Sequence, residues 1–212
     1  MKKTIGLIVV FTLALAACKT EKKVEVKDAV TVEKVATFNN IDLVNSVITW
    51  KGSKPTGSHN GDISLKEGSL VIKNDTVISG NFIIDMHSVN TLDLEPSSGK
   101  SDLESHLKAA DFFDVIKFPT AKFVITSSKV VEGKLMVTGN LTLKAITKSI
   151  TIPATVSSEN GITIFKSEVF NIDRTDFGVT YKSKTFNAQL KDKFINDMME
   201  ISFEVKTKAA TM

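Results

Sequence analysis

The sequence predicts an all-β domain, an antiparallel barrel of at least eight strands with one short helix. Three observations support this fold class. Apolar and polar residues alternate with a period of two in many short segments, which is the pattern of strands with one buried face. Turn-forming residues separate several of these segments, and a single segment shows helical spacing. Closure into a barrel removes exposed strand edges, although a two-sheet sandwich fits the same periodicity.

The first 17 residues have the layout of a secretory signal peptide. Lys2 and Lys3 precede an apolar stretch that ends in small residues, as such peptides do. The run Leu15-Ala16-Ala17-Cys18 resembles a bacterial lipobox, which implies cleavage before Cys18 and diacylation of its thiol. The alternative is an ordinary signal peptide with a leftover cysteine. Because Cys18 is the only cysteine, we expect no internal disulfide.

Residues 18–42 are predicted to be a lipidated N-terminus and a flexible tether. Lysines and acids alternate here without a sustained apolar face, which favours a solvated linker. A frayed strand over Val24–Val35 is the structural alternative. Lys19 follows Cys18, where Asp would signal inner-membrane retention under the enterobacterial rule. We therefore expect a lipid-anchored protein of the bacterial cell envelope, at the outer rather than the inner membrane.

The barrel domain is predicted over residues 43–208. Its expected strands cover residues 47–51, 62–66, 69–73, 78–86, 121–127, 135–144, 149–156, 162–170 and 201–206. Turns are expected at Lys66-Glu67-Gly68, Lys73-Asn74-Asp75 and Glu159-Asn160-Gly161. The inward rows combine Gly80 and Gly139 with large Phe residues. That mixture predicts local space inside the barrel.

The helix is predicted from Asp102 to about Ala110. Ser101 and Glu104 have the spacing of a capping box, and Leu103 and Leu107 form an i, i+4 apolar pair. An unusually apolar segment follows the helix, with Phe112 and Phe113 ahead of Pro119. We expect the helix to cover part of the domain.

Composition and motifs exclude several function classes. The net charge is +3, and the lysines are scattered among acids, so a nucleic-acid partner is not expected. The chain has no GxSxG motif and no phosphate-cradling glycine loop, which argues against an enzyme. His59, His87 and His106 lack the spacing of a metal site; folding would have to gather them with Asp62 or Asp85. We expect no metal and no cofactor.

Arg174 is the one arginine among 27 basic residues. Only arginine offers planar, bidentate hydrogen bonding. The use of arginine here, in a chain whose other basic residues are lysines, therefore indicates that position 174 requires that geometry. One interpretation is a fork to Asp173, Asp176 or another acid that fixes the Phe177-Gly178 turn. The other is a contact with an anionic head group.

Six motifs in order resemble the YceI family between Ser46 and Lys206. They are Gly57-Ser58-His59-Asn60-Gly61, Phe82-Ile83-Ile84-Asp85-Met86-His87-Ser88, His106-Leu107-Lys108-Ala109-Ala110-Asp111-Phe112-Phe113-Asp114, Phe118-Pro119-Thr120, Gly139-Asn140-Leu141-Thr142-Leu143 and Ile172-Asp173-Arg174-Thr175-Asp176-Phe177-Gly178. The resemblance implies an exported, eight-stranded lipocalin-like barrel that holds an isoprenoid or similar long-chain amphiphile in an elongated tunnel. Asn140 stands where the family often has Asp.

We therefore predict a ligand that is a polyisoprenoid, an isoprenoid quinone or a fatty acyl compound, bound for sequestration or transport. The alternatives are a stress-protective structural surface lipoprotein with a filled core, or a lipid-modifying enzyme that uses Asp85, His59 or His106. A homodimer is left open. The candidate ligand-binding residues are Trp50, His59, Phe82, Met86, His106, Phe112, Phe113, Phe123, Phe170, Arg174, Phe177 and Phe186.

Overall fold

The computed structural model describes residues 24–31, 40–73 and 76–209. The predicted signal peptide and Cys18 lie outside the described residues and stay predictions. The strands are β1 (Val26–Asp28), β2 (Val47–Lys54), β3 (Gly57–Ile63), β4 (Leu65–Lys73), β5 (Thr76–Asp85), β6 (Asn90–Thr91), β7 (Thr120–Val131), β8 (Lys134–Leu143), β9 (Ile146–Glu159), β10 (Ile162–Ser167), β11 (Phe170–Asp173) and β12 (Met198–Lys206). The helix α1 spans Lys100–Lys108, and short 3₁₀ helices η1 to η4 span Met86–Ser88, Pro96–Ser98, Arg174–Phe177 and Ala188–Lys193.

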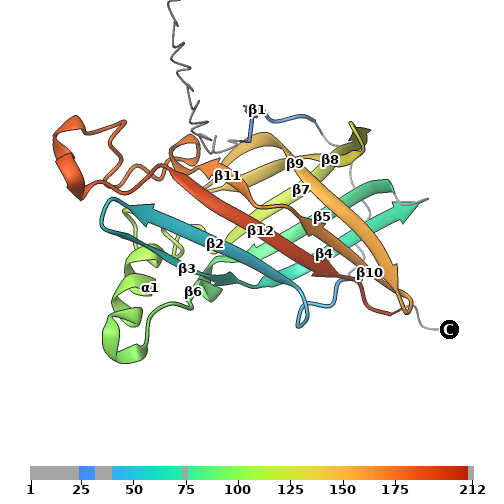
Figure 1. The fold of residues 1–212 in the computed structure, drawn as a ribbon, viewed down its shortest axis with the longest axis horizontal. Helices are drawn as coiled ribbons and strands as arrows, with labels where there is room; N and C mark the ends of the chain where they lie inside the picture. The colour runs from blue at the N-terminus through green and yellow to red at the C-terminus, as the bar shows by residue number, and fades with distance from the viewer. Residues whose placement is uncertain (1–23, 32–39, 74–75, 210–212) are drawn as a thin grey trace, which may run out of the picture.

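All twelve strands form one antiparallel sheet, in the order β4-β5-β7-β8-β9-β10-β12-β2-β3-β6, with β1 on β9 and β11 on β12. The sheet curls on itself, so that β12 and β2 cross in front of β5 and β7 (Figure 1). The predicted all-β, barrel-like fold class is confirmed. The predicted count of eight strands is too low, partly because the segment 162–170 divides into β10 and β11. Within the described residues the strand ladder has two ends, β4 and β6, so it forms a curled half-barrel.

The alternating pattern places apolar side chains inside and polar ones outside. On the outer face, the hydroxyls of Thr138 and Thr151 lie 2.8 Å apart across β8 and β9. Inside, the two glycines do not leave space. A Cβ on Gly139 would lie 2.5 Å from the Phe123 ring, and one on Gly80 would lie 2.8 Å from Ile125 Cδ1. These glycines accommodate the large side chains of the next strand, which corrects the prediction of local voids above them.

Two irregularities in β4 and β5 contradict the predicted strand pattern. Strand β4 runs through the predicted turn at Lys66-Glu67-Gly68, with a register shift between Leu65 and Glu67 against β5. A second shift, between Val71 and Ile72, leaves Ile78 52% exposed and Val77 buried. A bulge adds one residue and therefore exchanges the faces of the strand beyond it. The predicted strand over residues 62–66 also divides, because β3 ends at Ile63 and β4 begins at Leu65.

Two hairpin turns follow from their residue types. Asn160 and Gly161, between β9 and β10, have φ angles of 51° and 77°, and Glu132 and Gly133, between β7 and β8, have 50° and 78°. Both pairs are therefore left-handed, as tight two-residue hairpins require. The turn at Glu159-Asn160-Gly161 is confirmed; residues 74–75 of the third predicted turn lie outside the described residues.

The helix forms close to its predicted position, but its capping differs. It begins at Lys100 after Gly99, which has a φ of 87° and makes no side-chain cap. The carboxylate of Glu104 accepts the backbone N–H of Thr91 at 2.8 Å. The predicted capping box is therefore wrong, because Glu104 joins α1 to β6.

Residues 24–31 pack on the barrel and are not a tether. Val24 is 6% exposed, and its N–H donates to Asn171 O on β11 at 3.1 Å. Strand β1 pairs with β9, with Val26 opposite Ile150. The two valines supply the apolar side chains that a solvated linker would lack. The alternative expectation of a short strand holds for residues 26–28.

Asn40 connects two parts of the chain at one end of the barrel. Its side-chain amide donates to Leu70 O at 2.8 Å and accepts Leu70 N–H at 2.9 Å. Its backbone carbonyl accepts Lys208 N–H at 2.7 Å, and the next residue, Ile41, is fully buried and bridges to Thr207. Asn40 thus links the outer edge of β4 to the chain that follows β12.

We expect Asn40→Ala to destabilise the barrel by about 1–3 kcal/mol, because both backbone groups of Leu70 lose their partner. Asn40→Asp should also destabilise it, since a carboxylate cannot donate to Leu70 O. Asn45→Ala, at an exposed turn position, is the control and should change stability by less than about 0.5 kcal/mol. Equilibrium urea unfolding measures all three; equal midpoints for Asn40→Ala and Asn45→Ala would contradict the proposed linkage.

Candidate functional site

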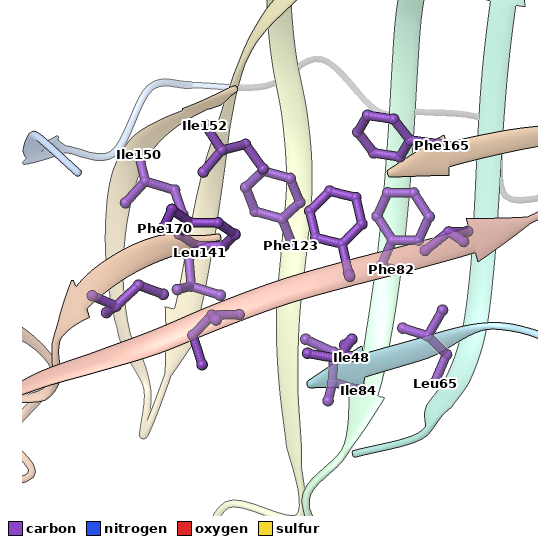
Figure 2. A pocket seen from close by; sticks show the side chains of 14 residues that line it. Ile48, Leu65, Phe82, Ile84, Phe123, Leu141, Ile150, Ile152, Phe165 and Phe170 are labelled. Atoms are coloured by element: carbon purple, nitrogen blue, oxygen red, sulfur yellow. The ribbon is translucent and has the colours of Figure 1, made fainter. Parts of the chain in front are cut away.

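The curled sheet encloses a cavity whose lining side chains are all apolar. Its volume is about 80 Å³, below the range of about 300–1,000 Å³ typical of ligand pockets. Figure 2 shows Phe82, Phe123 and Phe170 directed toward this space, with aliphatic side chains around them. We call it the inner cavity. It is lined by Ile48, Leu65, Phe82, Ile84, Phe123, Leu141, Ile150, Ile152, Phe165, Phe170, Ile172, Ile201, Phe203 and Val205.

The alternation of inward and outward side chains along each strand produces this lining. Alternate residues face inward on several strands: Phe82 and Ile84 on β5, Ile150 and Ile152 on β9, Ile201, Phe203 and Val205 on β12. The Phe165 ring lies 6.3 Å from that of Phe82 and 4.9 Å from that of Phe203. Rings from three strands therefore form one wall of the inner cavity.

Two further cavities continue from the inner cavity toward α1. Ile201 lines both the inner cavity and a middle cavity of about 70 Å³. Trp50, Phe112 and Ile195 line both the middle cavity and a third, of about 430 Å³. We call the third cavity the mouth, and the inner and middle cavities together the tunnel. The three lie in series, separated by the side chains that they share.

The mouth, unlike the tunnel, carries polar groups. His59 Nδ1 lies 2.9 Å from Asp93 Oδ2, and Asn60 N–H donates to Asp93 Oδ1 at 3.0 Å. Burial raises the pKa of the Asp93 carboxyl, but these two hydrogen bonds outweigh it and hold that pKa below its usual value. Asp93 is therefore charged at neutral pH and orients the imidazole of His59.

His106 lies on the other side of the mouth, between aromatic rings. Its ring centroid is 4.6 Å from that of Tyr181 and 5.9 Å from that of Phe112, both in edge-on arrangements. His106 Nε2 lies 3.5 Å from Asp111 Oδ2. The remaining charged residues that line the mouth are Lys54, Lys182, Lys193 and Asp192.

Trp50 borders the mouth and the middle cavity. Its indole lies where a side chain on Gly61 would be, because a Cβ there would approach two indole carbons to 2.7 Å. The indole Nε1 donates to Asp62 O at 3.3 Å. The missing side chain of Gly61 therefore permits the ring to lie flat on β3 beside the tunnel.

Arg174 is fully buried and bound mainly to backbone. Its Nε donates to Asn196 O at 3.1 Å, Nη1 to Val179 O at 2.7 Å, and Nη2 to Ile195 O at 3.0 Å and to Asp197 Oδ1 at 3.2 Å. Burial lowers the pKa of the guanidinium, and Asp197 acts against that shift. Arg174 thus ties the turn after η3 to residues 195–197, which border the tunnel.

Of the acids that the fork interpretation allowed, the one hydrogen-bonded to Arg174 is another acid, Asp197, which was not named. Asp173 accepts the N–H and hydroxyl of Thr175 at the start of η3. The geometry favours the structural interpretation of Arg174 over a contact with an anionic head group, because its described hydrogen bonds go to the protein itself.

The predicted ligand-binding residues fall into five groups. Phe82, Phe123 and Phe170 line the inner cavity; Trp50, Phe112, Phe113 and Arg174 line the middle one; His59 and His106 line the mouth, as Trp50 and Phe112 also do. Met86 and Phe177 are buried in the packed core and line none of the three cavities. Phe186 is 64% exposed. It was wrongly assigned to the pocket, because the loop that carries it turns its ring into solvent.

The prediction missed the aliphatic lining and the mouth residues between β11 and β12. Ile48, Ile84, Ile201 and their neighbours occupy the same inward rows that predicted the strands, so periodicity alone offered a signal for them. Tyr181 and Lys193 offered none, since they belong to loops that only the fold brings to the mouth.

Neither a metal site nor a spanning helix is found among the described residues. In residues 24–31, 40–73 and 76–209, no three His, Cys, Asp or Glu side chains are grouped closely enough to hold a metal ion. His59 pairs with Asp93, and Asp62 accepts from Asn90. The helices of these same ranges are too short or too polar to cross a membrane.

The sequence of the barrel decides its family. Residues 40–207 match the model of the YceI-like domain, which covers most of the chain. The chain belongs to the YceI-like domain family. The match begins at Asn40, close to the predicted boundary of 43, and leaves β1 outside it.

Curated relatives match over a shorter region. The proteins named YceI from Salmonella arizonae and Salmonella newport are each 38% identical over 82 residues, which is 39% of this chain and 39% of each relative. The aligned region thus spans less than half of those relatives.

Solved structures of YceI-like proteins share the fold. BcnA of Burkholderia cenocepacia is 22% identical, with a TM-score of 0.63 over 80% of this chain and 100% of that one. A polyisoprenoid-binding domain from Saccharophagus degradans is 15% identical, with a TM-score of 0.58 over 81% and 98%. The Campylobacter jejuni YceI protein is 20% identical, with a TM-score of 0.52 over 96% and 100%. At these identities the likeness establishes the fold.

We expect Arg174→Ala to destabilise the protein by about 3–5 kcal/mol, because it leaves a partly buried acid and several carbonyls without their partner. Arg174→Lys keeps the charge but cannot reach the same carbonyls together, so it should also cost stability. Thermal and chemical unfolding of the purified variants measure both effects. An unchanged melting temperature for Arg174→Ala would contradict the structural role.

Proposed function

We propose that this YceI-like domain binds a long-chain amphiphile, a polyisoprenoid, an isoprenoid quinone or a fatty acyl compound, for sequestration or transport. The observation that carries the proposal is the series of cavities, which is apolar inside the barrel and polar at the mouth. An amphiphile has the same division along its length. Its chain would lie in the tunnel and its polar end beside His59 and His106. The polyisoprenoid-binding domain with the same fold supports this reading.

The energetics of such a ligand need few polar contacts. Burial of apolar chain contributes about 0.8 kcal/mol per CH₂, so about 15 carbons contribute about 12 kcal/mol before the costs of association. A tunnel lined by apolar side chains is therefore sufficient for tight binding. This explains why the sequence carries few motifs of a binding site.

The structure bears on the two alternatives. A filled core would leave no apolar space, whereas about 80 Å³ remains between the apolar side chains of the inner cavity. An enzyme that modifies lipids would need an acid and a base beside the reactive group. His59 and Asp93 form such a pair at the mouth, which is the arrangement that an enzyme would use. The binding role rests instead on the apolar inner cavity and on the fold shared with a polyisoprenoid-binding domain.

We further propose that the domain is held at the envelope by an acylated Cys18, at the outer membrane. Only residues 19–23 separate Cys18 from Val24, where the described barrel begins. At about 3.5 Å per residue, six steps of chain reach about 20 Å at most. A lipid-anchored barrel would therefore lie close to the membrane surface, which suits exchange of a membrane lipid.

We expect Ile201→Phe to weaken ligand binding at least about tenfold, or about 1.4 kcal/mol, because it enlarges the side chain shared by the inner and middle cavities. Titration of the delipidated protein with a long-chain isoprenoid quinone, followed by quenching of Trp50, measures this. Ser202→Phe, on the outer face of the same strand, is the matched control and should leave affinity unchanged. Equal affinities for both variants, with solvent extracts of the purified protein free of lipid, would contradict a ligand in the tunnel.

We expect Cys18→Ser to move the protein from the membrane fraction to the soluble fraction without unfolding the barrel, because an acyl anchor requires the thiol. Fractionation after a high-salt wash, with circular dichroism of the released protein, checks both parts. Retention of the variant on membranes would rule out the acyl anchor.

A further inference from the structure

The ladder of the barrel wall is interrupted beside the inner cavity. Strand β10 pairs with β9 as far as Ser167 opposite Ala154, and β11 then follows β12 alone. Strand β9 continues in the other direction to Ile146, with β8 on its far edge. The near edge of β9 over residues 146–152 therefore faces β11 without a ladder between them.

Strand β1 occupies this gap. It pairs with β9 from Val26 opposite Ile150 to Asp28 opposite Lys148, while Val24 N–H donates to Asn171 O on β11. Figure 1 shows β1 beside β9 and β11. Ile150 and Ile172, which flank the gap, both line the inner cavity. Residues 24–28 thus lie beside the two side chains that bound this part of the cavity, although none of them lines it.

The chain holds the next residues with a second contact. Asn140 on β8 donates from Nδ2 to Val30 O at 2.6 Å and accepts Val30 N–H on Oδ1 at 3.0 Å. A side-chain amide matches the donor and acceptor of a peptide group, whereas a carboxylate has no donor. This is the position at which the family often has Asp, so Asn140 suits the N-terminal segment of this chain.

The attachment is local and small. Strand β1 has three residues, and the ion pair between Lys148 and Asp28 spans 3.5 Å with the Asp28 side chain fully exposed. Exposed pairs of this kind contribute little to stability. A surface hollow lined by Val24, Val26, Lys148 and others borders the strand. Short edge segments with few buried contacts open at a lower free energy than the whole domain.

We propose that residues 24–30 form a detachable strand of the barrel wall, and that the ligand enters and leaves the inner cavity sideways between β9 and β11 when this strand lifts. The inference rests on the proposed function, since it assigns a route to the same ligand. The route through the mouth passes Trp50, Phe112 and then Ile201. The lateral route passes β1 and the side chains of Ile150 and Ile172. Strand β1 lies outside the region matched by the family model. Because β1 is near Cys18 in the sequence, it also lies near any acyl anchor.

A reversible disulfide tests the route. Lys27 and Ser149 are register partners, and opposed residues of antiparallel strands have the spacing that a disulfide needs. The full chain with Cys18→Ser, Lys27→Cys and Ser149→Cys holds the engineered pair as its only cysteines. Vesicles that carry a long-chain isoprenoid quinone are mixed with the oxidised and the reduced protein, and quenching of Trp50 is followed in time. We expect quenching and its reversal to slow at least about tenfold on oxidation, because the opening of β1 is blocked.

The matched control is a disulfide in the continuous part of the wall. Thr155→Cys with Lys166→Cys joins β9 to β10 at another register pair, and its oxidation should leave the rates unchanged. The final amplitude of quenching reports binding, and the rate reports the route. Full amplitude with equal rates in the oxidised and reduced Lys27–Ser149 variant would overturn the lateral route alone. Loss of amplitude in every variant would overturn the proposed function and this inference with it.

Asn140→Asp provides an independent test without a cross-link. The carboxylate loses the donor to Val30 O and repels that carbonyl, so β1 should detach more often. We expect faster hydrogen exchange of the amides of residues 24–30 and quinone uptake accelerated several-fold, with the exchange of β8 and β12 amides unchanged. Faster amide exchange without faster uptake would contradict the proposed role of the strand.

Discussion

An apolar interior has to be kept from water by a sheet whose ladder does not run all the way round. Where the strand pairing stops, polar side chains hydrogen-bond to the backbone groups that a neighbouring strand would otherwise pair. Asn40 pairs with both groups of Leu70 at the edge of β4, and Asn140 pairs with both groups of Val30 beside β1. An amide presents one donor and acceptor in the geometry of a peptide group, so it can complete a pairing where no strand continues. The apolar lining depends on these contacts because an unpaired backbone group beside it would be costly.

Arg174 applies the same principle with a larger group. Three carbonyls and one carboxylate from residues 179 and 195–197 converge on it. These segments come from loops, which have no ladder of their own to hold them. A buried guanidinium with several planar donors fixes them together, and Ile195 and Asn196 thereby form part of the middle cavity. The position of the loops beside the middle cavity is therefore set by a residue whose described hydrogen bonds all go to the protein.

The family relationship and the particular features of this chain lie in different regions. The curled sheet is shared with YceI-like structures of only 15–22% identity, because many apolar residues can fill the same inward positions. The segment that covers β9 precedes the matched region. Strand β1 thus lies outside the matched domain, between it and the cysteine that we expect to carry the acyl chains.

The sequence by itself determined the class of fold and the inward rows, since a period of two is a local property that any strand with one buried face must satisfy. It also determined the tight turn at Asn160 and Gly161, whose positive φ angles follow from residue type. It could not determine that Ile78 points outward, because the bulge depends on the partner strand. Only the tertiary structure decided that Glu104 binds Thr91, that Arg174 binds Asp197, and that Phe186 lies in solvent. Those outcomes depend on which distant segments come into contact. No local sequence pattern predicts a contact between residues that are far apart in the sequence.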